Sequence, residues 1–270
     1  MVGGDFSTRT ASPPRARSSE APRALQVAGA HPSRGGGGNS PDFSVGLFVK
    51  SCRLMVVNLS EQYSLLCNWI SEIRDESVQQ DRMRFRRNLE RIGEVAAYEI
   101  SKTLPFVEKE VQTPLGIAVG KVLREQPVIT TILRAGLPLH QGLLNFFDKA
   151  DNGFISAYRK HQRDGSFEIS LDYVSCPELE GRVVIVSDPM LATGASLVKT
   201  IQYLREEGHP AQIHVVVAIA CTVGIEFVLR SEPQCTIWCG DIDDELTAKG
   251  YIVPGLGDAG DLAFGTKVQM

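Results

Sequence analysis

Two kinds of apolar pattern follow each other along the chain from about residue 58. In the segment 81–102, the apolar residues Leu89, Ile92, Ala96 and Ile100 recur at the spacing of an amphipathic helix. The run 183–186 is instead apolar at every position, as in strands that are buried on both faces. These patterns predict helices over residues 62–74, 81–102, 138–147, 196–207 and 223–230, and strands over residues 128–133, 153–158, 183–186, 213–220 and 235–239.

The alternation of buried strands with helices predicts an α/β fold in which helices cover both faces of a central parallel sheet. Asp164-Gly165, between residues 159–163 and 166–173, is a tight-turn sequence and predicts a β-hairpin arm. The longest apolar run, residues 212–221, contains His214 and is far shorter than the roughly 20 residues of a membrane-spanning helix. We therefore expect no membrane segment.

Residues 1–54 differ in composition from the rest of the chain. They contain four consecutive glycines at 35–38, five prolines and no sustained apolar period, which predicts a segment without regular structure. Arginine and serine with few acids are also typical of an organellar transit peptide. A third interpretation is an upstream-extended start, with Met55 as the natural one. The predicted domains are thus a disordered leader or extension over 1–54 and a folded domain over 55–270.

Charge separates the same two parts of the chain. Residues 1–54 hold seven Lys or Arg against three acids, a charge of +4, and the remainder holds 21 against 29, a charge of −8. An acidic body argues against broad nucleic-acid binding, which needs a basic face. The helix predicted over 81–102 carries an arginine cluster, for which a solvated or subunit-facing side is favoured over an RNA site. The cluster consists of Arg82, Arg84, Arg86, Arg87 and Arg91.

Six cysteines are spread along the chain, which is typical of reduced thiols in a cytosolic protein. Cys235 and Cys239 are close in sequence, but no second Cys/His pair completes a zinc framework. We expect these two side chains to be small core fillers.

The stretch 187–196, SDPMLATGAS, follows a predicted strand and leads into a helix. Unpaired amide groups and the positive end of the helix dipole would meet there, which favours a phosphate. Thr193 and Ser196 can add hydroxyl donors, and Asp188 is suited to accept from the hydroxyls of a sugar. The stretch therefore predicts a ribose 5-phosphate site, with a proline turn before a capped helix as the alternative. Walker and dinucleotide fingerprints are absent.

Two further loops carry candidate chemistry. Arg134, followed by Ala135 and Gly136, ends another predicted strand and could hold a diphosphate with its fixed charge and exposed amides. Arg159 and Lys160 at the predicted hairpin could add charge. The segment 251–261 has three glycines, a proline and few functional side chains, so its backbone could match the edge of a flat heterocycle. A surface arginine, a solvated hairpin and an ordinary C-terminal loop are the respective alternatives.

Taken together and in this order, the loops resemble the uracil phosphoribosyltransferase family. VIVSDPMLATGAS resembles the family's phosphoribosyl pyrophosphate loop, TILRAGL its pyrophosphate loop and YIVPGLGDAGDLAFGTK its uracil-binding C-terminal hood. DRMRFRRNLERIGEVAAYEIS and FISAYRK also match, so the similarity extends from about Met55 to Lys267. The hood is the most specific motif, and residues 1–54 match nothing in the family.

The resemblance implies a type I phosphoribosyltransferase fold with a C-terminal hood. It implies a pentosyl-transferring glycosyltransferase of pyrimidine salvage, which converts uracil and 5-phospho-α-D-ribose 1-diphosphate to UMP and diphosphate. By the same resemblance Arg134 and Arg159 hold the diphosphate, and Asp258 acts on the phosphoribosyl donor through water on Mg2+. The implied ribose-phosphate residues are Asp188, Pro189, Met190, Leu191, Ala192, Thr193, Gly194, Ala195 and Ser196. The implied uracil residues are Ile252, Gly257, Asp258 and Ala259.

Further expectations come from the family. Mg2+ is the expected cofactor, held mainly by the substrate with no direct protein ligand. A homodimer or homotetramer in the cytoplasm is expected, with an organellar location if 1–54 is a transit peptide, and activation by GTP is left open. Two departures stand out: Ser187 precedes a single acid, as in uracil-specific members, and Ala195 replaces a common glycine.

Three alternative functions stay open at this point. One is a UMP-sensing, RNA-binding regulator on the same fold, which the arginine cluster supports and the complete hood opposes. Another is a catalytically silent homologue that serves as an interaction domain. The third is a transferase for a purine or orotate, against which the hood argues.

Overall fold

An eight-stranded sheet forms the centre of the protein. The structure is a computed structural model that describes residues 55–161 and 167–266. The strand order is β1-β10-β9-β7-β4-β5-β6, and the short β8 pairs with β9. All neighbours are parallel except β5 and β6, which are antiparallel. The bounds are β1 Val56–Asn58, β4 Val128–Leu133, β5 Asp151–His161, β6 Phe167–Ser175, β7 Val183–Ser187, β8 Met190–Leu191, β9 Gln212–Cys221 and β10 Thr236–Asp243.

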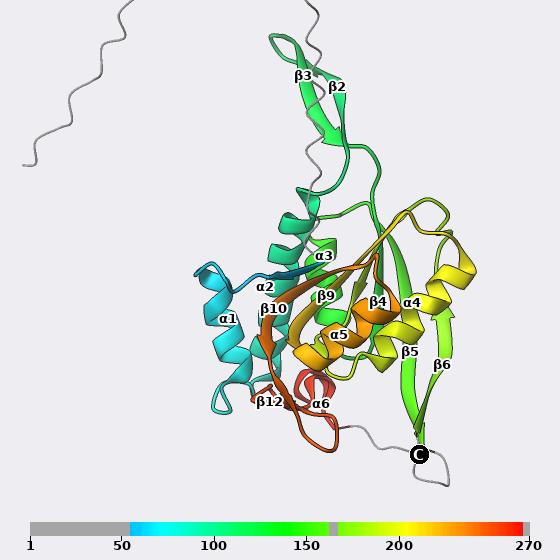
Figure 1. Ribbon diagram of the computed structural model, residues 1–270. Coiled ribbons are helices and arrows are strands. Elements are labelled where there is room, and N and C mark those ends of the chain that lie inside the picture. The colour runs from blue at the N-terminus through cyan, green and yellow to red at the C-terminus, as the bar shows by residue number, and fades with distance from the viewer. Residues whose placement is uncertain (1–54, 162–166, 267–270) are drawn as a thin grey trace, which may run out of the picture. The chain divides into compact units, whose positions relative to one another are not determined.

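Helices cover both faces of this sheet, as Figure 1 shows. On one face, α1, α2 and α3 pack on the sheet in one apolar core. On the other face, α4 and α5 enclose a second core. The bounds are α1 Leu65–Arg74, α2 Arg82–Ser101, α3 Leu137–Leu144, α4 Ala195–Glu207 and α5 Thr222–Ser231. The predicted α/β class with a mostly parallel, doubly covered sheet is confirmed.

The central strands are apolar at almost every position because both of their sides are buried. In β9, nine of the ten residues are buried, and in β4 five of six are. Cys235 and Cys239 lie buried in the second core, as predicted for core fillers. Within the described residues, no helix is both long and apolar enough to cross a membrane.

One antiparallel hairpin of the fold was not predicted from the sequence, whereas the C-terminal hood was expected from the family resemblance. The strands β2 (Phe106–Thr113) and β3 (Gly116–Leu123) form a separate antiparallel hairpin that extends away from the sheet in Figure 1. The C-terminal hood contains β11 (Glu245–Leu246), β12 (Ile252–Val253) and α6 (Ala259–Phe264). The predicted hairpin of residues 159–173 corresponds to β5 and β6. Its turn Asp164-Gly165 and the predictions on residues 1–54 lie outside the described residues.

Candidate active site

The first two candidate loops begin at neighbouring strand ends. Strand β4 ends at Leu133 and β7 ends at Ser187, and Thr131 is paired with Ser187 in the register of these two strands. The Thr131 hydroxyl donates to the Ser187 carbonyl at 3.3 Å. Because the two strands are parallel, Arg134 and Asp188 emerge at the same edge of the sheet, where ligands bind in open α/β folds.

The loop after β4 is packed tightly against β7. Gly136 donates its amide to the Ile132 carbonyl at 3.0 Å and directly precedes α3. A β-carbon at position 136 would lie only 2.8 Å from the carbonyl oxygens of Ile132 and Ser187. The sequence Ala135-Gly136 is therefore needed for the close approach of the loop to β7, and it fixes where Arg134 leaves the strand.

Asp188 is largely buried just beyond the end of β7. Its amide donates to the Val216 carbonyl at 3.1 Å, and its carboxylate accepts from the Met190 amide at the long distance of 3.5 Å. Burial raises the pKa of the Asp188 carboxyl to about 7, and the Met190 amide opposes this only in part. A carboxyl group that titrates near neutral pH at a strand end is a candidate binding group.

The middle of the stretch 187–196 is part of the core. The side chains of Pro189 and Leu191 are buried, and residues 190–191 pair with β9 as β8. The Ser187 hydroxyl donates to the Thr130 carbonyl at 3.2 Å, which accounts for a polar residue inside the sheet. Any ligand contact from Pro189 or Leu191 would therefore come from the main chain.

The end of the stretch forms the N-terminus of α4. Gly194 precedes the helix with φ of 81°, a left-handed conformation that favours glycine. Among residues 55–161 and 167–266, no side chain caps this helix at Gly194, and the Ala195 amide reaches the Thr193 hydroxyl only at 3.4 Å. The amides of the first turn are thus open toward an anion, as predicted. Ala195 is the first helical residue and has no need of glycine's conformational freedom.

The hood presents mainly backbone to the same edge of the sheet. The side chains of Ile252 and Ala259 are buried, whereas Gly257 and Asp258 are exposed. Asp258 caps α6 by accepting from the Asp261 amide at 3.0 Å. A flat base could therefore meet amide and carbonyl groups of this segment, with few side chains between them.

The first loop and the hood lie side by side. Nη2 of Arg134 lies 3.5 Å from Oδ1 of Asp261 and 3.4 Å from the carbonyl oxygen of Gly265. Both contacts are long, and the Arg134 side chain is 42% exposed, so the guanidinium can turn toward a ligand. The structure thereby brings together Arg134, the Asp188 loop and the hood. Arg159 and Lys160 are on β5, but their side chains lie outside the described part.

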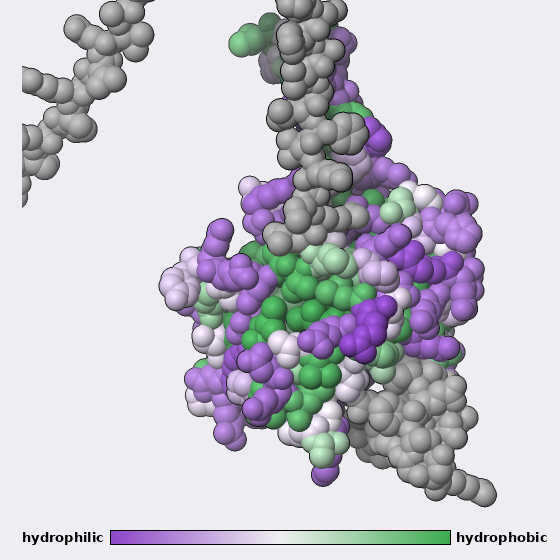
Figure 2. Space-filling model, viewed as in Figure 1, coloured by the Kyte–Doolittle hydropathy of each residue, from purple (hydrophilic) through white to green (hydrophobic). Residues whose placement is uncertain are grey.

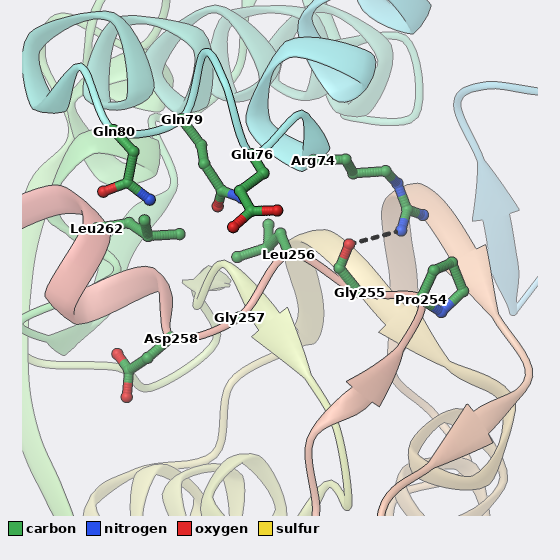
Figure 3. A pocket seen from close by; sticks show the side chains of 10 residues that line it. All are labelled: Arg74, Glu76, Gln79, Gln80, Pro254, Gly255, Leu256, Gly257, Asp258 and Leu262. Atoms are coloured by element: carbon green, nitrogen blue, oxygen red, sulfur yellow. Dashed lines mark hydrogen bonds between the residues drawn. The ribbon is translucent and has the colours of Figure 1, made fainter.

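Behind the hood is a pocket of about 380 Å³, between the turn after α1 and residues 254–262. Figure 3 shows Arg74, Glu76 and Gln79 on one side of it and Leu256 facing them, while the Asp258 carboxylate points away from this group. Arg74 was not predicted as a site residue. Its acidic partner Asp243 is 169 positions away, so no local motif could reveal the pair.

The arginine cluster contacts the protein's own groups. Arg84 pairs with Glu72, and Arg87 pairs with Glu90 at 2.6 Å. Arg86 donates to the Ala263 carbonyl at 2.7 Å, and Arg91 lies over the Trp69 ring at 5.6 Å. These contacts give no support to the RNA-binding alternative, because four of the five arginines already have partners within the fold.

Comparison with known proteins places this arrangement in one family. The family model described as "Uracil phosphoribosyltransferase" matches residues 60–266. A protein of that name from Porphyromonas gingivalis is 46% identical over 214 residues, which cover 79% of this chain and 99% of that protein. A protein of the same name from Pyrococcus furiosus is 38% identical over 204 residues, which cover 74% of this chain and 86% of that one.

A solved structure extends the similarity to three dimensions. A protein from Aquifex aeolicus matches with a TM-score of 0.71 and 32% sequence identity. The match covers 80% of this chain and all of that one. Apart from strand β1, the sheet, its covering helices and the three candidate loops lie within the residues that the family model matches.

Proposed function

The chain belongs to the uracil phosphoribosyltransferase family, and from that premise we propose how its residues carry out the transfer of a phosphoribosyl group to uracil. In this reaction N1 of uracil loses its proton and forms a bond to the anomeric carbon of 5-phospho-α-D-ribose 1-diphosphate while the bond to diphosphate breaks, which gives UMP, diphosphate and the released proton. The observation that carries the proposal is that loops 134–137, 188–196 and 252–261 meet at one edge of the sheet.

The stretch 188–196 holds the ribose 5-phosphate in this proposal. The open amides at the N-terminus of α4 and the hydroxyls of Thr193 and Ser196 face the phosphate. The Asp188 carboxylate accepts from the ribose hydroxyls, and in its ionised form both of its oxygens can do so. Main-chain groups of Pro189, Met190, Leu191, Ala192, Gly194 and Ala195 complete the cradle.

Diphosphate binding falls to Arg134 and Arg159. Arg134 starts directly beyond β4 with an exposed, weakly held guanidinium, which suits a group that must grip an incoming anion. Substitution at the anomeric carbon passes through a cationic sugar, so no protein nucleophile is required. Stabilising the departing diphosphate and aligning uracil therefore supply the catalysis.

Uracil is held by the hood through residues 252, 257, 258 and 259. The buried side chains of Ile252 and Ala259 leave their main chain as the contact with the base, and Gly257 is exposed. Alternating amide and carbonyl groups match the alternating donors and acceptors of the pyrimidine edge. This backbone match is our reason for uracil over a purine or orotate.

Mg2+ is part of the proposal as a partner of the substrate. The carboxylates Asp188 and Asp258 offer oxygen donors, the ligand type that Mg2+ prefers, so the residues fit the ion. The diphosphate would carry most of its coordination, and Asp258 would contribute through water. When bound, the ion supplies charge neutralisation for the departing diphosphate.

We propose the assembly state from the family and from the apolar side chains exposed on the surface, and the regulation from the family. Apolar side chains are exposed on the β2–β3 hairpin, including Ile117 and Val119, and on α5, at Val223 and Phe227. Figure 2 shows an apolar area on the face of the molecule that is turned to the viewer. Such areas mark interaction sites, and we assign them to further copies of this chain in a homodimer or homotetramer. A cytoplasmic location and activation by GTP are carried by the family alone. GTP titration of the rate of UMP formation tests the latter.

The direct experiment is to incubate the full chain with uracil, 5-phosphoribosyl 1-diphosphate and Mg2+ and to measure UMP. Cytosine, orotate and hypoxanthine serve as control bases. UMP formation with uracil, at a rate at least about tenfold above the other bases, is the expected result. Transfer to another base with none to uracil would contradict the assignment of the hood.

A further inference from the structure

We propose that Arg74 and Asp243 are positioning residues for uracil, because they fix the main chain of the hood at Gly255. This inference rests on the proposed function and extends it to two residues that lie outside the three loops. We call Arg74, Asp241, Asp243 and Gly255 together the hood clamp.

The clamp joins three distant parts of the chain through one guanidinium. Arg74 is the last residue of α1, and its Nη1 donates to Oδ2 of Asp243 at 2.8 Å and to the Gly255 carbonyl at 3.0 Å. Its Nη2 donates to Oδ1 of Asp243 at 2.9 Å and to Oδ2 of Asp241 at 3.0 Å. The pair with Asp243 is bidentate, a geometry that fixes direction as well as distance.

Asp243 holds the same hood residue from the other side. Its Oδ2 also accepts from the Gly255 amide at 3.0 Å, so both polar main-chain groups of Gly255 are bound within the clamp. Gly255 lies two residues before Gly257 and three before Asp258. A shift at Gly255 would therefore move the main chain that is proposed to contact the base.

The clamp is enclosed enough for its geometry to matter. The side chain of Asp243 is 7% exposed and that of Arg74 is 18% exposed. A shielded ion pair contributes directional specificity more dependably than net stability. A change in the geometry of the Arg74–Asp243 pair should therefore displace the main chain of the hood before it lowers the stability of the fold.

In this proposal, neither the Arg74 nor the Asp243 side chain contacts uracil or the phosphoribosyl donor. Figure 3 shows Arg74 bonded to Gly255 at the pocket behind the hood, with the Asp258 carboxylate pointing elsewhere. Arg74 and Asp243 thus act on the base through the main chain of residues 255–258. This makes them positioning residues, and the expected effect is on uracil rather than on the phosphoribosyl donor.

The structure offers a matched control at the amino-terminal side of the sheet. Arg182 has a similar exposure of 20% and also pairs with two acids, Glu125 at 2.7 Å and Asp151 at 3.1 Å. Asp151 is the first residue of β5, and Arg182 directly precedes β7, so this pair lies away from the strand ends that carry the loops. Arg182→Lys likewise replaces a guanidinium that pairs with two acids, without touching the hood.

The test compares Arg74→Lys, Asp243→Asn and Arg182→Lys in the full chain. We expect the first two to raise KM for uracil by about tenfold or more, with KM for the phosphoribosyl donor within about twofold, and Arg182→Lys to leave both unchanged. In the double variant Arg74→Lys with Asp243→Asn, KM for uracil should be no higher than in the more impaired single variant, because both substitutions disrupt the same Arg74–Asp243 pair. Equal effects on both KM values, or none on KM for uracil in folded variants, would overturn the proposal.

Amide hydrogen exchange gives a readout that does not depend on turnover. Exchange of residues 252–258 should speed up by about tenfold in Arg74→Lys and stay unchanged in Arg182→Lys, with melting temperatures reported for both. Unchanged exchange in Arg74→Lys would refute the clamp. If the wild-type chain forms no UMP, the proposed function fails, and exchange still decides whether Arg74 holds the hood.

Discussion

Asp188 links the ionisation of a single residue to both stability and activity. Burial holds the pKa of its carboxyl at about 7, against an ordinary value of 3.8, so folding favours the protonated form. Its contribution to the free energy of unfolding is therefore largest below pH 3.8 and is lost as the pH rises toward about 7. The ribose hydroxyls are bound more strongly by the opposite, ionised form, in which both carboxylate oxygens accept.

We predict that kcat/KM for the phosphoribosyl donor rises as the pH increases through about 7, while the melting temperature falls between about pH 3.8 and about 7. Asp188→Asn should flatten this limb of both profiles and lower kcat/KM. The comparison with Asp188→Asn is necessary because the donor's own phosphate also titrates near this pH. Identical pH profiles in wild type and variant would exclude Asp188 as the titrating group.

Arg134 has few contacts within the fold to lose. Its side chain is 42% exposed, and within the described part of the chain its guanidinium makes only the long contacts to Asp261 and Gly265. We predict that Arg134→Ala lowers kcat/KM by roughly 30- to 1000-fold, because one charge-assisted contact to the diphosphate is removed. The melting temperature should change by less than about 2 °C. Near-normal turnover in a folded variant would remove Arg134 from the mechanism.

At the scale of elements, the N-terminus of α4 shows how backbone conformation sets up binding. Gly194 has φ of 81°, and a β-carbon there would lie 3.0 Å from the Gly224 carbonyl oxygen and from Cγ2 of Val228. The neighbouring Ala195 is the first residue of the helix. Adjacent positions in one phosphate loop therefore have opposite requirements for glycine.

We predict that Gly194→Ala raises KM for the phosphoribosyl donor by about tenfold and lowers the melting temperature, because the left-handed backbone and the contact with α5 are both disturbed. Ala195→Gly, the matched change next to it, should alter KM by less than about threefold. Steady-state kinetics and thermal melting of the two variants check this. The reverse order of effects would contradict the assigned conformations.

The sequence predicted those helices and strands that bury one or both faces, because burial leaves an apolar pattern, and it missed elements that are mostly exposed. The helix predicted over 81–102 is α2, and the run 183–186 lies within β7, because one buried stripe or two buried faces leave a clear apolar period. The β2–β3 hairpin was missed because nearly all residues of β2 and most of β3 are exposed, so no alternation marks them. The hood clamp was missed because Arg74 and Asp243 meet only through the tertiary fold.

At the scale of the whole molecule, the β2–β3 hairpin carries an exposed apolar surface far from the site loops. Ile117 is 68% exposed, so replacing it should not disturb the fold. If the hairpin binds another copy of this chain, Ile117→Lys should reduce the oligomer to a smaller species by light scattering. Tyr63→Lys, at an exposed hydrophobic position outside the hairpin, is the control and should leave the mass unchanged. An unaltered mass in Ile117→Lys would remove the hairpin from the interface.

The central claim is that three distant loops form one active site that joins uracil to ribose 5-phosphate. The most direct measurement is the stoichiometry of UMP and diphosphate when the full chain is mixed with uracil, 5-phosphoribosyl 1-diphosphate and Mg2+. The account predicts equal amounts of both products from the wild type and a strongly reduced rate from Arg134→Ala. Release of diphosphate without UMP, or no turnover by the folded wild-type chain, would contradict it.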